Sequence, residues 1–333
     1  MKSPCSRGRR SFVFSAGAAA LASVLPHGRS FGSEPAYPSR PVTIVVPFAP
    51  GGGSDIVARM LAIDLSKRWG TAVVVENKPG AGGQIGNAFV ARAAPDGHTL
   101  LLGITTLIQA PSLYRNLPYD AFRDFTPLAQ LATSSNFLVL PASSPTGTLK
   151  EFVASVRARP GKVSYGSNGN AGTSHLHGAL LNASQKLDMV HVPYNGSGPL
   201  LTALLGQQVD CAFVDIAPLR PHVLAGKLKV IAVTGPRRSA AFPQTPTLEE
   251  LGVPGFEPVG WFSLFGPANL PEAVASKVST TALQAMRTPE VEKRLEELGL
   301  TPSQLSTQAF AEAMKTDFPK WQKMIREGDV HVE

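Results

Sequence analysis

The alternation of short apolar runs with longer helical patterns constrains the fold more than any other feature of this sequence. Residues 42–48, VTIVVPF, are apolar almost throughout, as is typical of a strand buried on both faces of a sheet. The pattern of residues 54–70 predicts a helix. Ser54 or Asp55 should cap its start, and Gly70 should end it. Two further strands separated by a helix complete a β-α-β-α-β order, which predicts an α/β fold with a parallel, doubly wound sheet.

A second α/β set follows in the middle of the chain. Apolar runs and helical patterns alternate there over residues 136–144, 148–161, 163–167, 175–185, 189–198, 199–208, 209–216 and 228–235. Another strand is predicted from Gly260, and the last part of the chain has the pattern of three helices. No linker rich in Pro, Gly or Ser separates two halves, and 333 residues exceed one ordinary domain. These features predict two domains between which the chain crosses more than once.

The first 33 residues have a different composition from the rest. They carry five basic residues and no acidic one, and their apolar centre from Phe12 to Leu25 is followed by Pro26. This pattern indicates a signal peptide, and the Arg9-Arg10 pair resembles that of a twin-arginine export signal. We expect cleavage between residues 30 and 36 and a mature protein in the periplasm.

The charge of the remaining chain is nearly balanced. The whole sequence has 31 basic and 24 acidic residues, a net charge of +7. Without the five basic residues of the leader, 26 basic and 24 acidic residues remain, a net charge of +2. We therefore expect no nucleic-acid partner. Cys211 is the one cysteine after the leader, so no disulfide is expected within the mature chain.

Residues 48–55, FAPGGGSD, place three glycines between the first strand and the first helix. A phosphate-binding loop would need a lysine after the glycines, whereas Ser54 and Asp55 follow Gly53 here. The first amides of a helix have no partner within the helix, and the helix dipole adds positive charge. This corner can therefore bind an anion such as a carboxylate. The alternative is that the glycines only permit a tight turn.

The same arrangement recurs in residues 164–181, SYGSNGNAGTSHLHGALL, where a glycine-rich loop again joins a strand to a helix. Ser167, Asn170 and Thr173 can donate hydrogen bonds there, although a plain polar loop is the alternative. Two such helix N-termini on opposite sides of a cleft would hold a small anion between them.

Other chemistries have little support in the residues. His175 and His177 lie two positions apart, hence on different faces of a helix, and no further ligand is near them, so we expect no metal site. In GAGGQIG, residues 80–86, the third glycine of a dinucleotide fingerprint falls one position late, so we expect no cofactor. A Gly-x-Ser-x-Gly motif and a nucleophile–base pair are missing, so we expect no catalysis. Asp215 could accept a hydrogen bond from a ligand amine or hydroxyl.

Eight segments together resemble one known family in both content and order. They are VPFAPGGGSD, VVVENKPGAGGQIG, AAPDGHTLLLG, LPYDAFRDFTPLAQL, PGKVSYGSNGNAGTSHL, HVPYNGSGPLLTALLGQQVD, PQTPTLEELGVPGFE and GWFSLFGPANLP. The family is that of the substrate-binding proteins of tripartite tricarboxylate transporters, also called Bug receptors. The resemblance runs along nearly the whole chain after the leader.

The resemblance implies a two-lobed periplasmic binding protein of type II topology, with a cleft between the lobes. The first lobe would comprise residues 36–136 and 260–333, and the second lobe residues 137–259. NFLVLP and GWFSLF would be the hinge strands. Two positions depart from the family pattern: His177 stands where a small residue is usual, and Gln207 where a second glycine is frequent.

The resemblance also implies a function. The protein would be a non-catalytic, monomeric receptor that captures a small carboxylate, such as a dicarboxylate, tricarboxylate, aromatic acid or acidic amino acid. It would close on this ligand by a hinge motion and deliver it to a membrane permease. The alternatives are a ligand sensor that docks on a membrane histidine kinase, and a secreted enzyme for carboxylic acids.

The residues expected to contact the ligand come from both glycine-rich corners and from neighbouring loops. They are Phe48, Ala49, Pro50, Gly52, Ser54, Asp55, Thr105, Thr106, Ser167, Asn170, Gly172, Thr173, Asn195, Ser197 and Asp215.

Overall fold

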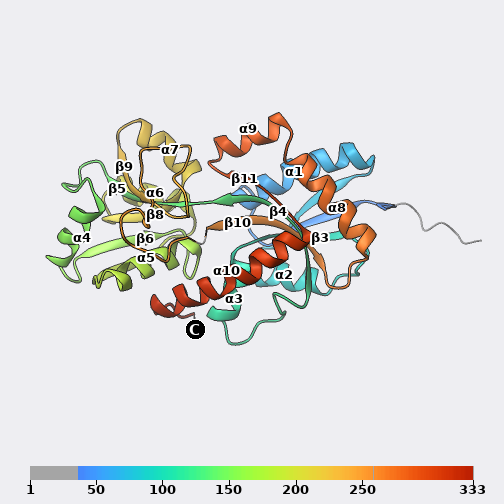
Figure 1. The fold of residues 1–333 in the computed structure, drawn as a ribbon, viewed down its shortest axis with the longest axis horizontal. Coiled ribbons are helices and arrows are strands. Elements are labelled where there is room, and N and C mark those ends of the chain that lie inside the picture. Colours follow the sequence, from blue (N-terminus) through green and yellow to red (C-terminus); the bar gives the residue numbers. More distant parts are fainter. Residues whose placement is uncertain (1–36, 258, 333) are drawn as a thin grey trace, which may run out of the picture. The chain divides into compact units, whose positions relative to one another are not determined.

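The computed structural model describes residues 37–257 and 259–332, so the predicted signal peptide lies outside the described residues. Within these ranges the chain forms two mixed β-sheets with helices packed against them (Figure 1). No helix of this described part is both long and apolar enough to cross a membrane.

The first sheet contains the predicted β-α-β-α-β unit. Its strands are β1 (Val42–Val46), β2 (Val73–Asn77), β3 (Thr99–Ile104), β4 (Phe125–Ser134), β10 (Gly260–Pro267) and β11 (Thr301–Ser306). Their order is β11-β4-β10-β3-β1-β2, and β1 pairs in parallel with both β2 and β3. The sheet is mixed rather than parallel throughout, because β10 runs antiparallel to β3 and β4. Phe262, near the start of β10, pairs with Ile104, the last residue of β3. Because β10 begins where β3 ends, the two strands run in opposite directions.

The second sheet is built from the middle of the chain. Its strands are β5 (Asn136–Pro141), β6 (Val163–Ser167), β7 (Met189–Pro193), β8 (Cys211–Asp215) and β9 (Leu228–Val233). Their order is β7-β6-β8-β5-β9. β6 is parallel to β7 and β8, whereas β5 is antiparallel to β8 and β9.

The helices follow the predicted alternation, with two additions. They are α1 (Gly53–Trp69), α2 (Gln84–Ala91), α3 (Thr106–Leu113), α4 (Leu149–Arg157), α5 (Thr173–Ser184), α6 (Ser197–Leu205), α7 (Ile216–Leu224), α8 (Glu272–Ala285), α9 (Pro289–Glu297) and α10 (Thr307–Glu327), with a 3₁₀ turn η1 (Ala81–Gly83). α3 and α7 were not predicted, because each contains an internal proline, Pro111 or Pro221, which normally indicates the end of a helix. Strands β4 and β11 were also not predicted.

Apolar packing holds α1 against the first sheet and so positions the start of this helix. Ile44 and Val46 of β1 and Leu61 and Leu65 of α1 have no exposed surface and belong to one apolar cluster. Burial of each such side chain contributes about 1.5–3 kcal/mol to folding. The first turn of α1 is therefore anchored at the carboxyl end of β1.

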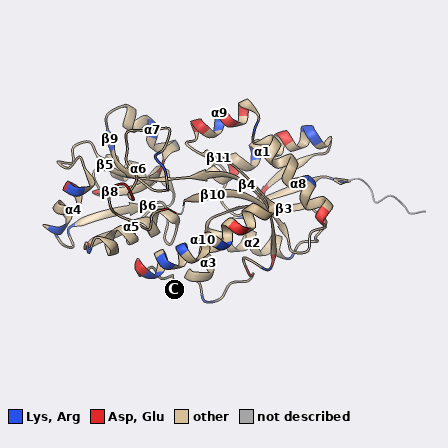
Figure 2. Ribbon diagram, in the orientation of Figure 1, with Lys and Arg blue, Asp and Glu red and all other residues tan. Residues whose placement is uncertain are grey.

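The chain crosses between the two sheets twice. It leaves the first sheet at Ser134 and enters the second at Asn136, and it returns between β9 and β10. Ser134 is paired with Gly260, and Asn136 is paired with Asp215, so the crossing segments lie beside the end of β8. Strands β4, β5 and β10 contain no charged residue, whereas helices such as α9 and α10 carry many (Figure 2). The lobe boundaries near residues 136 and 260 stay a prediction.

Helix α10 makes contacts with elements of both sheets. It packs on β4 and α3 of the first set and on α5 of the second. Its Trp321 is fully buried and lies with its ring centroid 5.8 Å from that of His177 in α5. The C-terminal helix therefore joins the two halves outside the crossing strands.

Candidate functional site

A cavity of about 490 Å³ lies where the two sets of elements meet. Its lining comes from the β1–α1, β3–α3, β6–α5 and β7–α6 corners, from the end of β8, and from the β4–β5 and β10 crossing segments. Gln109 of α3 donates a hydrogen bond to Thr173 Oγ1 of α5 at 3.3 Å, which connects the two sides. The volume is within the range of about 300–1,000 Å³ that is usual for small-molecule sites.

Within the described residues, five helices begin at this cavity. The N-cap residue of each helix lies in the cavity lining. Three of these residues are glycines, which have no side chain, and the side chains of the other two make no capping hydrogen bond. The N-caps are Gly52 (α1), Thr105 (α3), Gly172 (α5), Gly196 (α6) and Asp215 (α7). The first amides of a helix lack intrahelical partners and carry partial positive charge. Five such ends around one cavity make it a site for an anion.

Hydrogen bonds to the buried side chain of Asp55 fix the glycine-rich loop before α1. Its Oδ2 accepts hydrogen bonds from the Gly51 amide at 3.0 Å and from Arg59 Nε at 2.9 Å, and its Oδ1 accepts from Asn77 Nδ2 at 3.0 Å. The hydrogen bond from Arg59 is the main reason that the pKa of Asp55 is lowered to about 2. Gly51 has φ of +84°, which favours glycine. The prediction that Ser54 or Asp55 caps α1 is wrong: Gly52 is the N-cap, and Asp55 fixes the loop instead.

The corner before α5 is held by hydrogen bonds from neighbouring side chains. Ser167 Oγ donates to the Gly169 carbonyl at 2.9 Å and lies 2.7 Å from His191 Nε2. Because the single hydroxyl proton of Ser167 is used in the first bond, His191 Nε2 must carry the proton and donate. The Ala171 amide donates to His175 Nδ1 at 2.9 Å, which supports Ala171 at a φ of +55°.

The two histidines of this corner are stacked and kept neutral. The rings of His175 and His191 lie 3.6 Å apart with an interplanar angle of 6°, and Tyr165 stacks on His191 at 5.0 Å. Burial lowers the pKa of His175 to about 4, with a further contribution from His191, and burial also lowers that of His191 to about 4. Neutral His175 can then accept the Ala171 hydrogen bond, so the loop geometry depends on the uncharged ring.

A polar network lies at the crossing segments, beside the cavity. Asp215 Oδ1 accepts from Asn136 Nδ2 at 2.8 Å and from Ser134 Oγ at 3.2 Å. Asn136 Oδ1 lies 3.1 Å from His177 Nδ1. Since the Asn136 amide nitrogen donates to Asp215, its oxygen accepts from His177. Burial raises the pKa of Asp215, and the two hydrogen bonds oppose this effect.

Ten of the residues predicted from the sequence line the cavity. They are Phe48, Gly52, Ser54, Thr105, Thr106, Asn170, Gly172, Thr173, Ser197 and Asp215. Their contact with a ligand stays a prediction.

The other five predicted residues do not line the cavity, for identifiable reasons. Ala49 and Pro50 lie on the exposed side of the first corner. Asp55 and Ser167 are buried and use their polar atoms to hold the two loops. Asn195 is exposed, and its neighbour Gly196 lines the cavity in its place.

Several lining residues were not predicted. The apolar ones include Ile104, Leu113, Tyr114, Trp261 and Phe262, and the polar ones include Ser134 and Asn136. The aromatic pair at the start of β10 was visible in GWFSLF as a strand signal. Its place in the cavity follows from the pairing of β10 with β3 and β4, which no local pattern shows.

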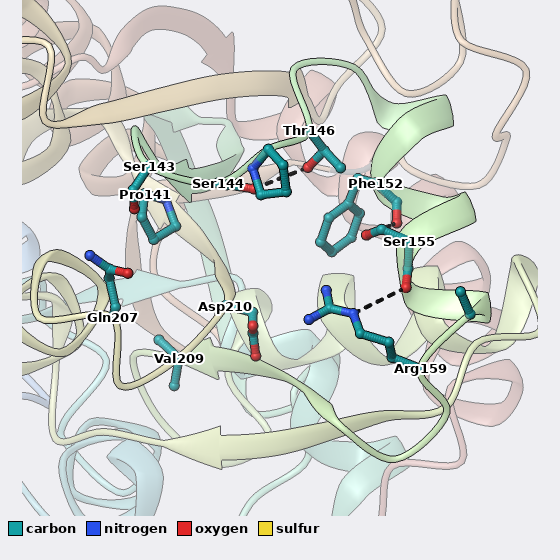
Figure 3. Close-up of a pocket in the computed structure, with 12 residues that line it drawn as sticks. Pro141, Ser143, Ser144, Thr146, Phe152, Ser155, Arg159, Gln207, Val209 and Asp210 are labelled. Carbon is teal, nitrogen blue, oxygen red and sulfur yellow. Dashed lines mark hydrogen bonds between the residues drawn. The ribbon is translucent and has the colours of Figure 1, made fainter.

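A second cavity, of about 430 Å³, lies between the β5–α4 loop, α4 and the α6–β8 loop (Figure 3). Arg159 and Asp210 line it, and Arg159 Nε donates to the Ser155 carbonyl at 3.4 Å. The nearby start of α4 is satisfied by a capping box of Thr148 and Glu151, so it has fewer free amides to offer. No set of helix N-termini lines this cavity, and we do not place the ligand there.

The described residues contain no group of three His, Cys, Asp or Glu that could hold a metal ion. Cys211 is buried, and burial raises the pKa of its thiol, so the reactive thiolate is disfavoured.

Comparison with known proteins assigns the chain to a family. Residues 57–330 match the family model described as the tripartite tricarboxylate transporter family receptor. The chain belongs to this family. The resemblance to Bug receptors is thereby confirmed, and this receptor family consists of solute-binding proteins.

Three solved structures of similar proteins share the receptor fold. The R. palustris protein Rpa4515 with adipate is 30% identical, with 89% of this chain and 100% of that chain covered and a TM-score of 0.80. The periplasmic binding protein BugD is 33% identical, with 89% and 100% covered and a TM-score of 0.78. MatC from Rhodopseudomonas palustris with bound malate is 34% identical, with 87% and 100% covered and a TM-score of 0.77. This receptor therefore has the two-lobed α/β fold of periplasmic binding proteins.

Proposed function

We propose that this protein is a periplasmic receptor that captures a small carboxylate between its lobes and delivers it to a membrane permease. The observation that carries the proposal is the set of helix N-termini around one cavity. Such ends can hold a carboxylate through backbone amides, without a cationic side chain. Two relatives of the same fold are described with adipate and with malate, both of which are carboxylates.

Capture would occur by hinge closure. The two sheets are joined by the β4–β5 and β9–β10 crossings, and the ligand cavity is lined from both sides of these crossings. A ligand that touches both sides only in the closed form stabilises that form by its additional contacts. Small-angle X-ray scattering should show a smaller radius of gyration when the ligand binds.

Delivery to a permease is supported by the family to which the chain belongs, whose description names a tripartite transporter. The ligand can be identified by mass spectrometry of the acid released when the purified native protein is denatured. Uptake of that acid, labelled with carbon-14, should depend on the gene for this receptor. Normal uptake in a strain without the gene would contradict delivery.

A charge placed at a cavity helix tests the binding site itself. Thr173→Asp adds a negative charge at the start of α5 inside the cavity, and we expect it to weaken binding of the released acid more than tenfold. Thr148→Asp adds the same charge at the start of α4, outside the cavity, and should leave affinity unchanged. Equal affinities of both variants and the wild type in isothermal titration calorimetry would refute this placement. Conversion of the acid into a product would refute a receptor role.

A further inference from the structure

The cavity has an unusual charge composition for a carboxylate site. Among its described lining residues, Asp215 is the one Asp or Glu, and there is no Lys, Arg or His. Positive potential therefore comes from helix N-termini, and the carboxyl group of Asp215 is the one acidic group in the lining. Asp215 is the N-cap of α7, whereas the N-caps of the other four helices, Gly52, Thr105, Gly172 and Gly196, carry no acid. A ligand in this cavity therefore meets amide donors at those four helix ends and a carboxyl group at the fifth.

Asp215 is held in place by the crossing segments. Its Oδ1 accepts hydrogen bonds from Ser134 and Asn136, which are the last residue of β4 and the first of β5. No donor to its Oδ2 is present among the described residues, and the residue is partly exposed to the cavity. Asp215 therefore keeps one acceptor oxygen for a ligand, in an orientation fixed by the protein.

The rest of the lining includes a substantial apolar part. Ile104, Leu113, Tyr114, Trp261 and Phe262 contribute it, mostly from the first-sheet side. These side chains suit a hydrocarbon or aromatic body between two polar ends. They offer little compensation for a charged group placed in the middle of the ligand.

We infer that Asp215 is a specificity residue, and that the receptor takes a carboxylate whose other end is a hydrogen-bond donor, a hydroxyl or a protonated amine. The carboxylate lies at the helix N-termini, and the donor binds Asp215 Oδ2. A second carboxylate at that end has no hydrogen to donate to Asp215 Oδ2, so it binds there only when a proton is shared between the two groups. This inference rests on the proposed function and specifies its ligand class.

Two matched ligand series test the inference by isothermal titration calorimetry on full-length mature protein freed of ligand by unfolding and refolding. The aromatic series is benzoate, 4-hydroxybenzoate, 4-(aminomethyl)benzoate and terephthalate. The aliphatic series is butyrate, 4-hydroxybutyrate, 4-aminobutyrate and succinate. In at least one series, the wild type should bind a donor-bearing acid at least tenfold more tightly than the dicarboxylate at pH 7.5. The hydroxyl and amine members distinguish the two kinds of donor.

Asp215→Asn keeps the acceptor for Ser134 and Asn136 and replaces Oδ2 by an amide donor. We expect this variant to reverse the order, with at least tenfold weaker binding of the donor-bearing acid and at least tenfold tighter binding of the dicarboxylate. Asp188→Asn removes an equal charge from an exposed position outside the cavity and should bind like the wild type.

The outcomes separate this inference from the proposed function. A wild type that prefers the dicarboxylate, or an Asp215→Asn variant with the wild-type order of affinities, overturns the role of Asp215 while leaving a carboxylate receptor intact. Absence of binding by any member of either series to the wild type, together with no acid released from the native protein, overturns the proposed function itself.

Discussion

Replacing the stacked histidines His175 and His191 should remove a large part of the acid sensitivity of folding. Burial holds both pKa values at about 4 in the folded protein, against an ordinary value of 6.5. The unfolded chain therefore takes up two protons as pH falls below about 6.5 that the folded protein refuses until about pH 4. Because protons bind the unfolded state more strongly, stability is lost as pH falls through this window and is fully present above it.

The magnitude follows from the two pKa values. Each histidine loses about 2.5 kcal/mol of stabilisation between pH 7.5 and pH 4.5, and the pair loses about 5 kcal/mol. His175 is 8% exposed and should reach this value, whereas His191 is less deeply buried and should contribute somewhat less. A loss of about 3–5 kcal/mol is a large share of the roughly 5–15 kcal/mol by which proteins are stable.

The assay compares the wild type with His175→Asn/His191→Gln. Asn can accept the Ala171 amide where His175 Nδ1 does, and Gln can donate to Ser167 where His191 Nε2 does, but neither titrates. Urea unfolding followed by tryptophan fluorescence gives the free energy of unfolding at both pH values. The double variant should lose about 3–5 kcal/mol less than the wild type. Equal losses in the two proteins would refute the reasoning. So would imidazole NMR signals of His175 and His191 that titrate near pH 6.5 in the folded wild type.

Three further substitutions test packing and hydrogen bonds by urea unfolding. Gly178→Ala should destabilise by about 1–3 kcal/mol, because a Cβ there would lie 2.2 Å from the Tyr165 ring; an unchanged midpoint would show that α5 can shift freely. Thr105→Val should cost about 1–3 kcal/mol by leaving the buried Trp261 amide without its acceptor at 2.7 Å; a neutral result would mean that another acceptor replaces it. Thr148→Ala removes a capping box and should cost about 1 kcal/mol without affecting ligand affinity; a change in affinity would argue against the assigned cavity.

Local patterns predicted much of the secondary structure. Strand β6, residues 163–167, was predicted with its observed bounds, and α1 ends at Gly70, which has the left-handed φ of +64° expected of a terminating glycine. Helices α3 and α7 were not predicted. Each contains an internal proline, which in the sequence normally indicates the end of a helix, but both segments are helical in the folded protein. Strand β11, TPSQLS, has one large apolar residue and acquires its strand form by pairing with β4.

The candidate site was predictable at its glycine corners and less so between them. A strand, a glycine-rich loop and a helix are contiguous in the chain, so the corners at Gly52 and Gly172 could be recognised from order alone. The roles of Asp55 and Ser167 could not, because their partners Asn77 and His191 are 22 and 24 residues away. Both residues are predicted ligand contacts, and the structure shows that their polar atoms hold the loops and that neither residue lines the cavity.

The amino-acid sequence by itself determined the alternation of strands and helices, the membership of a receptor family and the positions where helix N-termini follow glycines, since each of these depends on neighbours in the chain. The tertiary structure alone decided that three of those N-termini, together with the N-termini of α3 and α7, surround one cavity and that Asp215 lies there with Trp261 and Phe262. The physical reason is that helix dipoles and side chains from distant segments act together only after the crossing strands have brought them to one place.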